Sequence, residues 1–111
     1  MGYGVHVVGA VYGVDFKSLD KVKQVKKFLV ETVKESNLSY LSDKFHQFEP
    51  HGVTGVILLA ESHISIHTWP EDGFAAIDIF TCGPKADAVF AFDLLTSKLN
   101  PKRVEKQVIV R

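Results

Sequence analysis

The 111-residue sequence contains a single cysteine, Cys82, so the chain cannot form a disulfide bond within itself. A lone thiol is either packed as a small apolar residue or used in chemistry, and it suits a reducing compartment. No apolar run approaches the roughly twenty residues that a membrane-spanning helix needs, and residues 1–13 lack the features of a signal peptide. We therefore expect a cytoplasmic protein with no membrane partner.

An excess of charge of either sign is also missing. The 13 basic and 13 acidic side chains give a formal net charge of +0, which cannot neutralise phosphates and predicts no nucleic-acid partner. A small ligand is the better expectation. Because 46% of the residues are hydrophobic, the chain can bury one core, and we predict a single domain over residues 1–111. Self-association is a common way for so small a domain to cover its remaining apolar surface.

Apolar spacing predicts two long helices among several strands. From Ser18, which we take as the N-cap, apolar residues recur at intervals of three and four to near Asn37. A second helical pattern begins at Pro84 and stops at Asn100 and Pro101. Alternation and turn residues predict strands over residues 3–13, 39–48, 53–59, 62–68, 74–81 and 104–110, with a turn over 70–73.

The order of these elements predicts an α+β fold. Strand, helix, three or four strands, helix and strand form a two-layer α/β sandwich, with a mostly antiparallel sheet and both long helices on one face. Each half of the chain supplies one long helix, which makes a rough pseudo-repeat. The opposite face of the sheet must then be covered by something else or exposed to water.

Reactive side chains are concentrated in residues 61–71, ESHISIHTWPE. His63 and His67 are four residues apart, a spacing at which two helical histidines bind one zinc ion. This segment instead has the composition of a strand, in which four residues span about 13 Å, so we predict no metal site. Alternation places both histidines opposite Ile64 and Ile66, and for His63 we expect a hydrogen-bonded structural imidazole.

Several enzyme signatures are missing. The sequence has no Gly-x-Ser-x-Gly elbow of a serine hydrolase, and Gly52-Val53-Thr54-Gly55 is too short for a phosphate-binding loop and lacks its lysine. A conventional pyridoxal-phosphate fold does not fit in this length. What remains is a Glu61-Ser62 bond followed by polar residues in a strand.

Two motifs occur together in this sequence. The pattern ESHxxxHTWPE at residues 61–71 is followed by Thr81-Cys82-Gly83, and matching segments at residues 4–6, 45–56 and 75–83 extend the pattern over most of the chain. This combination resembles the S-adenosylmethionine decarboxylase proenzymes, in the short microbial branch of that family. The resemblance implies a carboxy-lyase that supplies the aminopropyl donor for spermidine and other polyamines. It also implies a homodimer of processed protomers, with sites near the interface.

The resemblance further implies that the chain cuts itself between Glu61 and Ser62, giving residues 1–61 (the β chain) and 62–111 (the α chain). The Ser62 hydroxyl attacks the Glu61 carbonyl to form an ester, a base removes the Ser62 α-proton, and elimination and hydrolysis leave a pyruvoyl group. Serine is required because its β-oxygen both attacks and leaves. The pyruvoyl ketone then forms a Schiff base with the substrate amine and draws electrons from the breaking carboxylate bond.

By the same resemblance, His67 and Thr54 serve the processing reaction. The family usually has serine at the position of Thr54, and the extra methyl and stiffer χ1 of threonine put the speed of processing in question. Strand alternation places Ser62 and His67 on opposite faces. We therefore expect a twist, turn or bulge at the cleavage site that lets them meet.

Three further residues take roles in catalysis and binding from the resemblance, and the chemistry of the indole ring adds Trp69. Cys82 returns a proton after carbon dioxide leaves, which a protonated thiol can do. Phe48 stacks on adenine, Glu71 binds the ribose hydroxyls, and Trp69 offers an aromatic face to the sulfonium cation. The alternatives for these three are a core phenylalanine, a solvated turn glutamate and a tryptophan at the edge of the core.

Two other functions stay open at this point. A pyruvoyl-dependent arginine decarboxylase would share the scaffold, the Glu-Ser cleavage site and the cysteine, although Phe48 and the Trp69-Pro70-Glu71 corner favour the adenosyl substrate. The other alternative is an unprocessed, non-enzymatic homologue that binds an adenosyl ligand, which Thr54 keeps open.

Overall fold

The computed structural model describes residues 3–111, apart from the side chain of residue 86, and in this range the chain forms six strands, three α-helices and a short 3-10 helix. In chain order these are β1 (Val5–Tyr12), α1 (Phe16–Leu19), α2 (Val22–Glu35), β2 (Tyr40–Gln47), β3 (Val53–Leu59), β4 (Ser62–Trp69), η1 (Pro70–Asp72), β5 (Phe74–Thr81), α3 (Lys85–Leu99) and β6 (Arg103–Val110).

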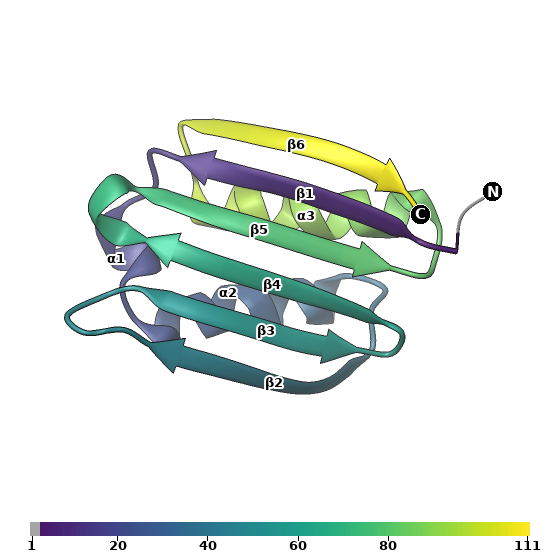
Figure 1. The fold of residues 1–111 in the computed structure, drawn as a ribbon, viewed down its shortest axis with the longest axis horizontal. Helices are drawn as coiled ribbons and strands as arrows, with labels where there is room; N and C mark the ends of the chain where they lie inside the picture. Colours follow the sequence, from purple (N-terminus) through teal and green to yellow (C-terminus); the bar gives the residue numbers. More distant parts are fainter. Residues whose placement is uncertain (1–2) are drawn as a thin grey trace.

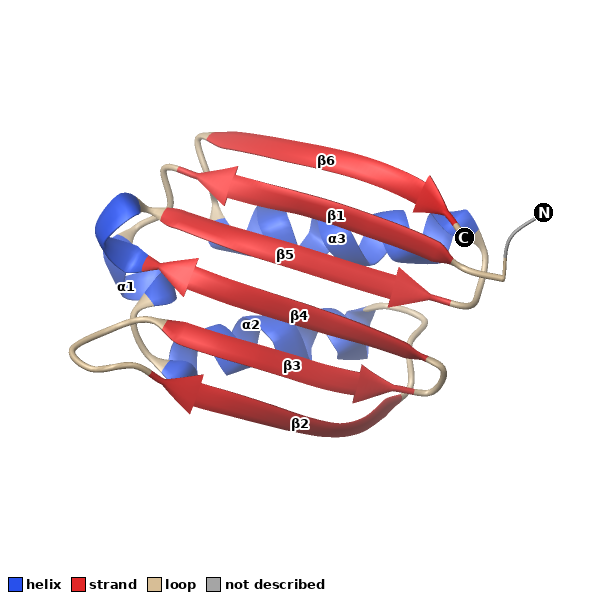
Figure 2. Cartoon of the chain, viewed as in Figure 1, coloured by secondary structure: helices blue, strands red, loops and turns tan. Residues whose placement is uncertain are grey.

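The strands form one antiparallel sheet in the order β2-β3-β4-β5-β1-β6 (Figure 1). Both long helices cover the same face of this sheet (Figure 2). Helix α2 packs under β2 and β3, and α3 packs under β5 and β1. This arrangement confirms the predicted two-layer α+β sandwich with one long helix in each half.

Alternation along the central strands explains which face holds the core. Ile64 and Ile66 of β4 and Ile77 and Ile79 of β5 are buried against the helices, where Phe92 of α3 packs among them. The residues between them point to the other face, on which no helix lies within the described part of the chain. We call this second face the open face.

The start of the first long helix differs from the sequence prediction. Ser18 is not an N-cap, because it lies inside the short helix α1, and α2 begins only after Lys21, whose backbone is extended. The side chain of Gln47, from β2, accepts a hydrogen bond of 2.8 Å from the Val22 amide and donates one of 2.8 Å to the Asp20 carbonyl. The helix is therefore capped by a residue 25 positions further along the chain.

The other expected elements are confirmed, with ends that differ by a few residues. The second helix follows Pro84 and ends at Asn100, which has a left-handed backbone with φ of 49°. The turn expected over residues 70–73 is η1 together with Gly73. None of the helices within residues 3–111 is long and apolar enough to cross a membrane.

Candidate active site

The Glu61-Ser62 bond lies in the tight turn that joins β3 to β4. Leu59 and Ser62 are paired across the hairpin, which leaves Ala60 and Glu61 as the turn. Glu61 has a φ of 58°, in the left-handed region, which costs a residue with a side chain about 1–2 kcal/mol. The peptide bond next to Ser62 is thus held in a strained turn at the surface.

The thiol of Cys82 reaches this turn from the end of β5. Its Sγ donates a hydrogen bond of 2.7 Å to the carbonyl oxygen of Glu61. A donor in this position draws electron density from the carbonyl carbon and stabilises negative charge that develops on the oxygen. Glu61, Ser62 and Cys82 also line a cavity of about 260 Å³, together with Asp87 of α3. We call these residues the cleavage cluster.

A second group of predicted residues gathers at the other end of β4. Thr54 and His67 are paired across β3 and β4, and a hydrogen bond of 3.0 Å joins Thr54 Oγ1 to His67 Nδ1. A cavity of about 220 Å³ has walls that include these two residues and Phe48, Trp69 and Glu71. We call this group the pocket cluster.

The pocket cluster offers both aromatic and anionic surface to a ligand. The side chains of Phe48 and Trp69 are 48% and 43% exposed, so neither is a core residue. His51 donates a hydrogen bond of 3.1 Å from Nε2 to Glu71 Oε1 and so orients the carboxylate. Sequence reasoning missed His51, because a histidine in a turn gives no sign of the glutamate that it meets 20 residues later.

The structure does not bring Ser62 and His67 together within one chain. The register between β3 and β4 has no shift from the pair Leu59–Ser62 to the pair Thr54–His67. Ser62 and His67 are five positions apart in the strand, which corresponds to about 16 Å. The expectation that a twist, turn or bulge at the cleavage site lets the two residues meet is therefore wrong within one chain. β4 is a regular strand directly after the turn, and Ser62 and His67 lie near its opposite ends.

The two histidines of the ESHISIHTWPE segment have different partners. His63 Nε2 donates a hydrogen bond of 3.0 Å to Asp78 Oδ2, which confirms a hydrogen-bonded imidazole, whereas His67 bonds to Thr54. Asp78 also bonds to His6. The sequence predicted no role for His6 or Asp78; the one available signal was the charge of Asp78 in an alternating strand.

Shifted pKa values occur away from both clusters. At the edge formed by β1 and β6, a hydrogen bond with Glu105 raises the pKa of Tyr12, and the same bond lowers the pKa of Glu105. Asp43 raises the pKa of Tyr40 by a hydrogen bond, and Glu35 does the same for Lys98. These shifts belong to exposed polar pairs rather than to the candidate site.

Comparison with known proteins agrees with this arrangement. The family model described as S-adenosylmethionine decarboxylase matches residues 5–111. Two relatives named S-adenosylmethionine decarboxylase proenzyme come from Sulfurihydrogenibium sp. (54% identity, 97% of this chain and 81% of the relative) and Aquifex aeolicus (50% identity, 95% and 78%).

Two solved structures share the fold. The adenosylmethionine decarboxylase of Aquifex aeolicus superimposes with a TM-score of 0.94 at 47% identity, covering 99% of this chain and 91% of that one. The AdoMetDC-delta26 monomer of Trypanosoma brucei, at 19% identity and a TM-score of 0.68 over 94% of this chain and 45% of that one, is similar in fold. These matches define the class of protein as a decarboxylase made as a proenzyme. The chain belongs to the S-adenosylmethionine decarboxylase family.

Proposed function

We propose that this chain is a self-processing, pyruvoyl-dependent S-adenosylmethionine decarboxylase that cuts itself between Glu61 and Ser62. The observation that carries this proposal is the Cys82 thiol bonded to the carbonyl of Glu61, at a strained turn directly before a serine. Family membership supports the same reaction. The products are residues 1–61, ending in a carboxylate, and residues 62–111, beginning with the pyruvoyl group.

In the cleavage step, Ser62 Oγ adds to the Glu61 carbonyl carbon while the Cys82 thiol stabilises the oxyanion. Breaking the C–N bond gives an ester with a free Ser62 amine. Loss of the Ser62 α-proton expels the Glu61 carboxylate, and water then replaces the nitrogen, which leaves as ammonia. Departure from the left-handed turn at Glu61 releases its backbone strain and favours the cut chain.

The base that removes the Ser62 α-proton must come from a second copy of the chain, because His67 of the same chain is about 16 Å away. Two copies can pack with their open faces together, related by a two-fold axis that lies between the faces and is perpendicular to the strands. This axis makes the strands of the partner run in the opposite direction. It therefore places the end of the sheet that carries His67 in one copy over the end that carries the Glu61-Ser62 turn in the other. The active site is then shared by two protomers.

The open face is large and apolar enough for this pairing. Strands of seven or eight residues in a sheet of six strands give it an area of about 750 Å² per copy. This is close to the roughly 800 Å² per partner of a standard interface. Leu58, Val8 and Ile109 expose 50%, 39% and 38% of their surface there. Burying these side chains would favour dimer formation.

The pocket cluster fits an adenosyl substrate. The exposed ring of Phe48 can stack on adenine, the carboxylate of Glu71 can accept hydrogen bonds from ribose hydroxyls, and the Trp69 ring can face a sulfonium cation. The pyruvoyl group supplies a carbonyl that takes up electrons from the breaking carboxylate bond. Cys82, beside Ser62, then returns a proton to the substrate carbon.

The test is release of carbon dioxide by the purified, processed protein from S-adenosylmethionine and, separately, from arginine. We expect release from S-adenosylmethionine, with the decarboxylated aminopropyl donor as product, and little from arginine, whose short chain leaves the Phe48 side of the pocket empty. Preferential turnover of arginine would replace this proposal with the related decarboxylase. An uncut chain that binds S-adenosylmethionine without turnover would favour the binding homologue.

A further inference from the structure

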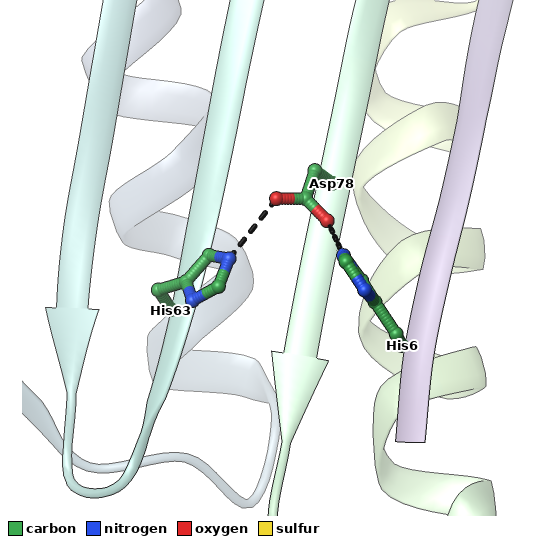
Figure 3. Close-up of side chains that lie close together, drawn as sticks. All are labelled: His6, His63 and Asp78. Carbon is green, nitrogen blue, oxygen red and sulfur yellow. Dashed lines mark hydrogen bonds and ion pairs between the residues drawn. The ribbon is translucent and has the colours of Figure 1, made fainter. Parts of the chain in front are cut away.

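Three neighbouring strands bring two imidazoles and a carboxylate together on the open face (Figure 3). His6 comes from β1, Asp78 from β5 and His63 from β4, and one ligand atom from each lies within 4.8 Å of the other two. None of the three belongs to the cleavage cluster or the pocket cluster. We call them the imidazole–carboxylate cluster.

The register of the sheet produces this cluster. His6 and His63 are both paired with Phe80, one from each side, and Asp78 lies two residues before Phe80 on the same face. The carboxylate therefore sits between the two rings, as Figure 3 shows. Both imidazoles also pack near the Phe80 ring, with centroid distances of 5.9 and 6.1 Å, which fixes their orientation.

We propose that the imidazole–carboxylate cluster binds a divalent transition metal ion of the zinc type. Two imidazole nitrogens and one carboxylate oxygen are a ligand set that zinc uses when it keeps its fourth position open. Zinc holds these atoms at about 2.0–2.2 Å, so ligands at tetrahedral angles are about 3.4 Å apart. His63 Nε2 and Asp78 Oδ2 are 3.0 Å apart, and all three ligand atoms lie within 4.8 Å of one another. Side-chain movements of about 1–2 Å therefore bring them to this spacing.

The surroundings support the carboxylate and leave a path for the ion. Ser65 donates a hydrogen bond of 3.3 Å from Oγ to Asp78 Oδ2, the type of outer contact that orients a metal ligand. The side chains of His6, Asp78 and His63 are 19%, 31% and 35% exposed, so an ion can enter from solvent in a single copy.

Arg111 is the one nearby group that opposes binding in the described part of the chain. Its guanidinium donates a 3.3 Å hydrogen bond to His6 Nδ1, which leaves the Nε2 hydrogen directed at Asp78. An ion on Nε2 requires the other tautomer, with hydrogen on Nδ1, and Arg111 must then turn away into solvent. Arg111→Ala should therefore bind metal more tightly, and weaker binding would contradict Nε2 ligation by His6.

The experiment has two readouts, because packing of the open face against a second copy could block the entry of metal ions added to the purified protein. Metal content is measured on protein isolated from zinc-supplemented culture, and the metal-free protein is titrated with Co²⁺ while its visible absorption is recorded. We expect one ion per chain and cobalt bands of a site with nitrogen and oxygen ligands. Absence of metal by both readouts would overturn the proposal and leave a hydrogen-bonded polar cluster.

Variants assign the ion to the cluster. His63→Gln keeps a hydrogen-bond donor to Asp78 but should weaken binding by more than about a hundredfold, as should Asp78→Asn, whereas Ser65→Ala should cost about tenfold. The matched control is His46→Ala, which removes an exposed imidazole from β2 and should leave metal binding unchanged. Binding that survives His63→Gln but is lost in Cys82→Ser would assign the ion to the thiol and refute a site at the imidazole–carboxylate cluster.

Discussion

At the residue scale, the proposed cleavage depends on which groups contact the Glu61 carbonyl. Its oxygen accepts a hydrogen bond from Cys82, and its carbon is next to the Ser62 nitrogen. Motif resemblance assigned Cys82 to proton return in the decarboxylation. The hydrogen bond from this thiol to the Glu61 carbonyl leads us to propose an earlier task for it, in the cleavage step.

Replacing Cys82 should therefore slow cleavage as well as turnover. In Cys82→Ala the oxyanion loses its donor, and we expect the cleavage rate to fall by about tenfold or more. Strong oxyanion donors contribute a hundredfold or more, and we expect a smaller effect from a thiol. Cys82→Ser keeps a donor and should cleave faster than the alanine variant. The measurement is the fraction of intact chain over time on denaturing gels. Equal cleavage by both variants and the native chain would remove Cys82 from this step.

Thr54 should act through the imidazole that it holds. Thr54→Val removes the hydroxyl bonded to His67 Nδ1 but keeps the side-chain shape, so cleavage should slow by about tenfold or more. Thr54→Ser keeps the bond with a less restricted χ1 and should cleave at least as fast as the native chain. The same gel assay separates the two variants. A valine variant that matches the native rate would show that the hydroxyl has no part in processing.

Motifs predicted many of the candidate site residues but not their contacts. Ser62, His67 and Cys82 follow from a pattern within 22 residues of sequence. His51 and Asp78 could not be found in this way, because their partners are fixed by the pairing of strands and by turns that bring distant residues together. The local sequence does not determine the register between these strands.

At the element scale, a glycine in β3 makes room for an aromatic ring of β2. Gly55 and Phe45 are paired, and a Cβ at Gly55 would lie 2.3 Å from the Phe45 ring. Gly55→Ala should lower the free energy of unfolding by about 1–3 kcal/mol, as for other overpacked sites. Ser42→Ala, on the exposed part of β2, is the control and should change it by less than about 0.5 kcal/mol. Urea unfolding measures both, and equal stability would show that the ring moves aside freely.

The start of α2 illustrates why helix boundaries are hard to predict. Spacing of apolar residues located the helix, but the cap comes from Gln47, which no local rule connects to Val22. Gln47→Ala should cost about 1–2 kcal/mol, because the Val22 amide at the start of the helix loses its acceptor. Gln47→Glu keeps an oxygen for Val22 and should lose less. Unfolding free energies of the two variants test this, and a fully stable alanine variant would contradict the capping role.

At the scale of the whole molecule, the central observation is the distance between Ser62 and His67. The sequence predicted the layers and the antiparallel sheet, since alternation and helical spacing are local. It could not predict that the cleavage cluster and pocket cluster lie at opposite ends of β4, because the same motif is compatible with a folded-back or a regular hairpin. That separation is the reason to place the active site between two copies.

Mixed dimers test the shared site. Chains with Ser62→Ala or His67→Ala should stay uncut when expressed alone. When the two are expressed together, a mixed dimer contains one site with Ser62 from one copy and His67 from the other. About half of the His67→Ala chain should then be cut, given random pairing. If co-expression gives no cut chain, both residues act within one protomer and the shared site is wrong.

The most direct test of the account is the denatured mass spectrum of the freshly purified protein. We expect two species: residues 1–61 with a free carboxylate, and residues 62–111 whose mass is lower by one ammonia than that of a serine-initiated chain. Ser62→Ala should give one intact species. An intact native chain after prolonged incubation, or a cut chain that begins with serine, would contradict a cofactor made from Ser62.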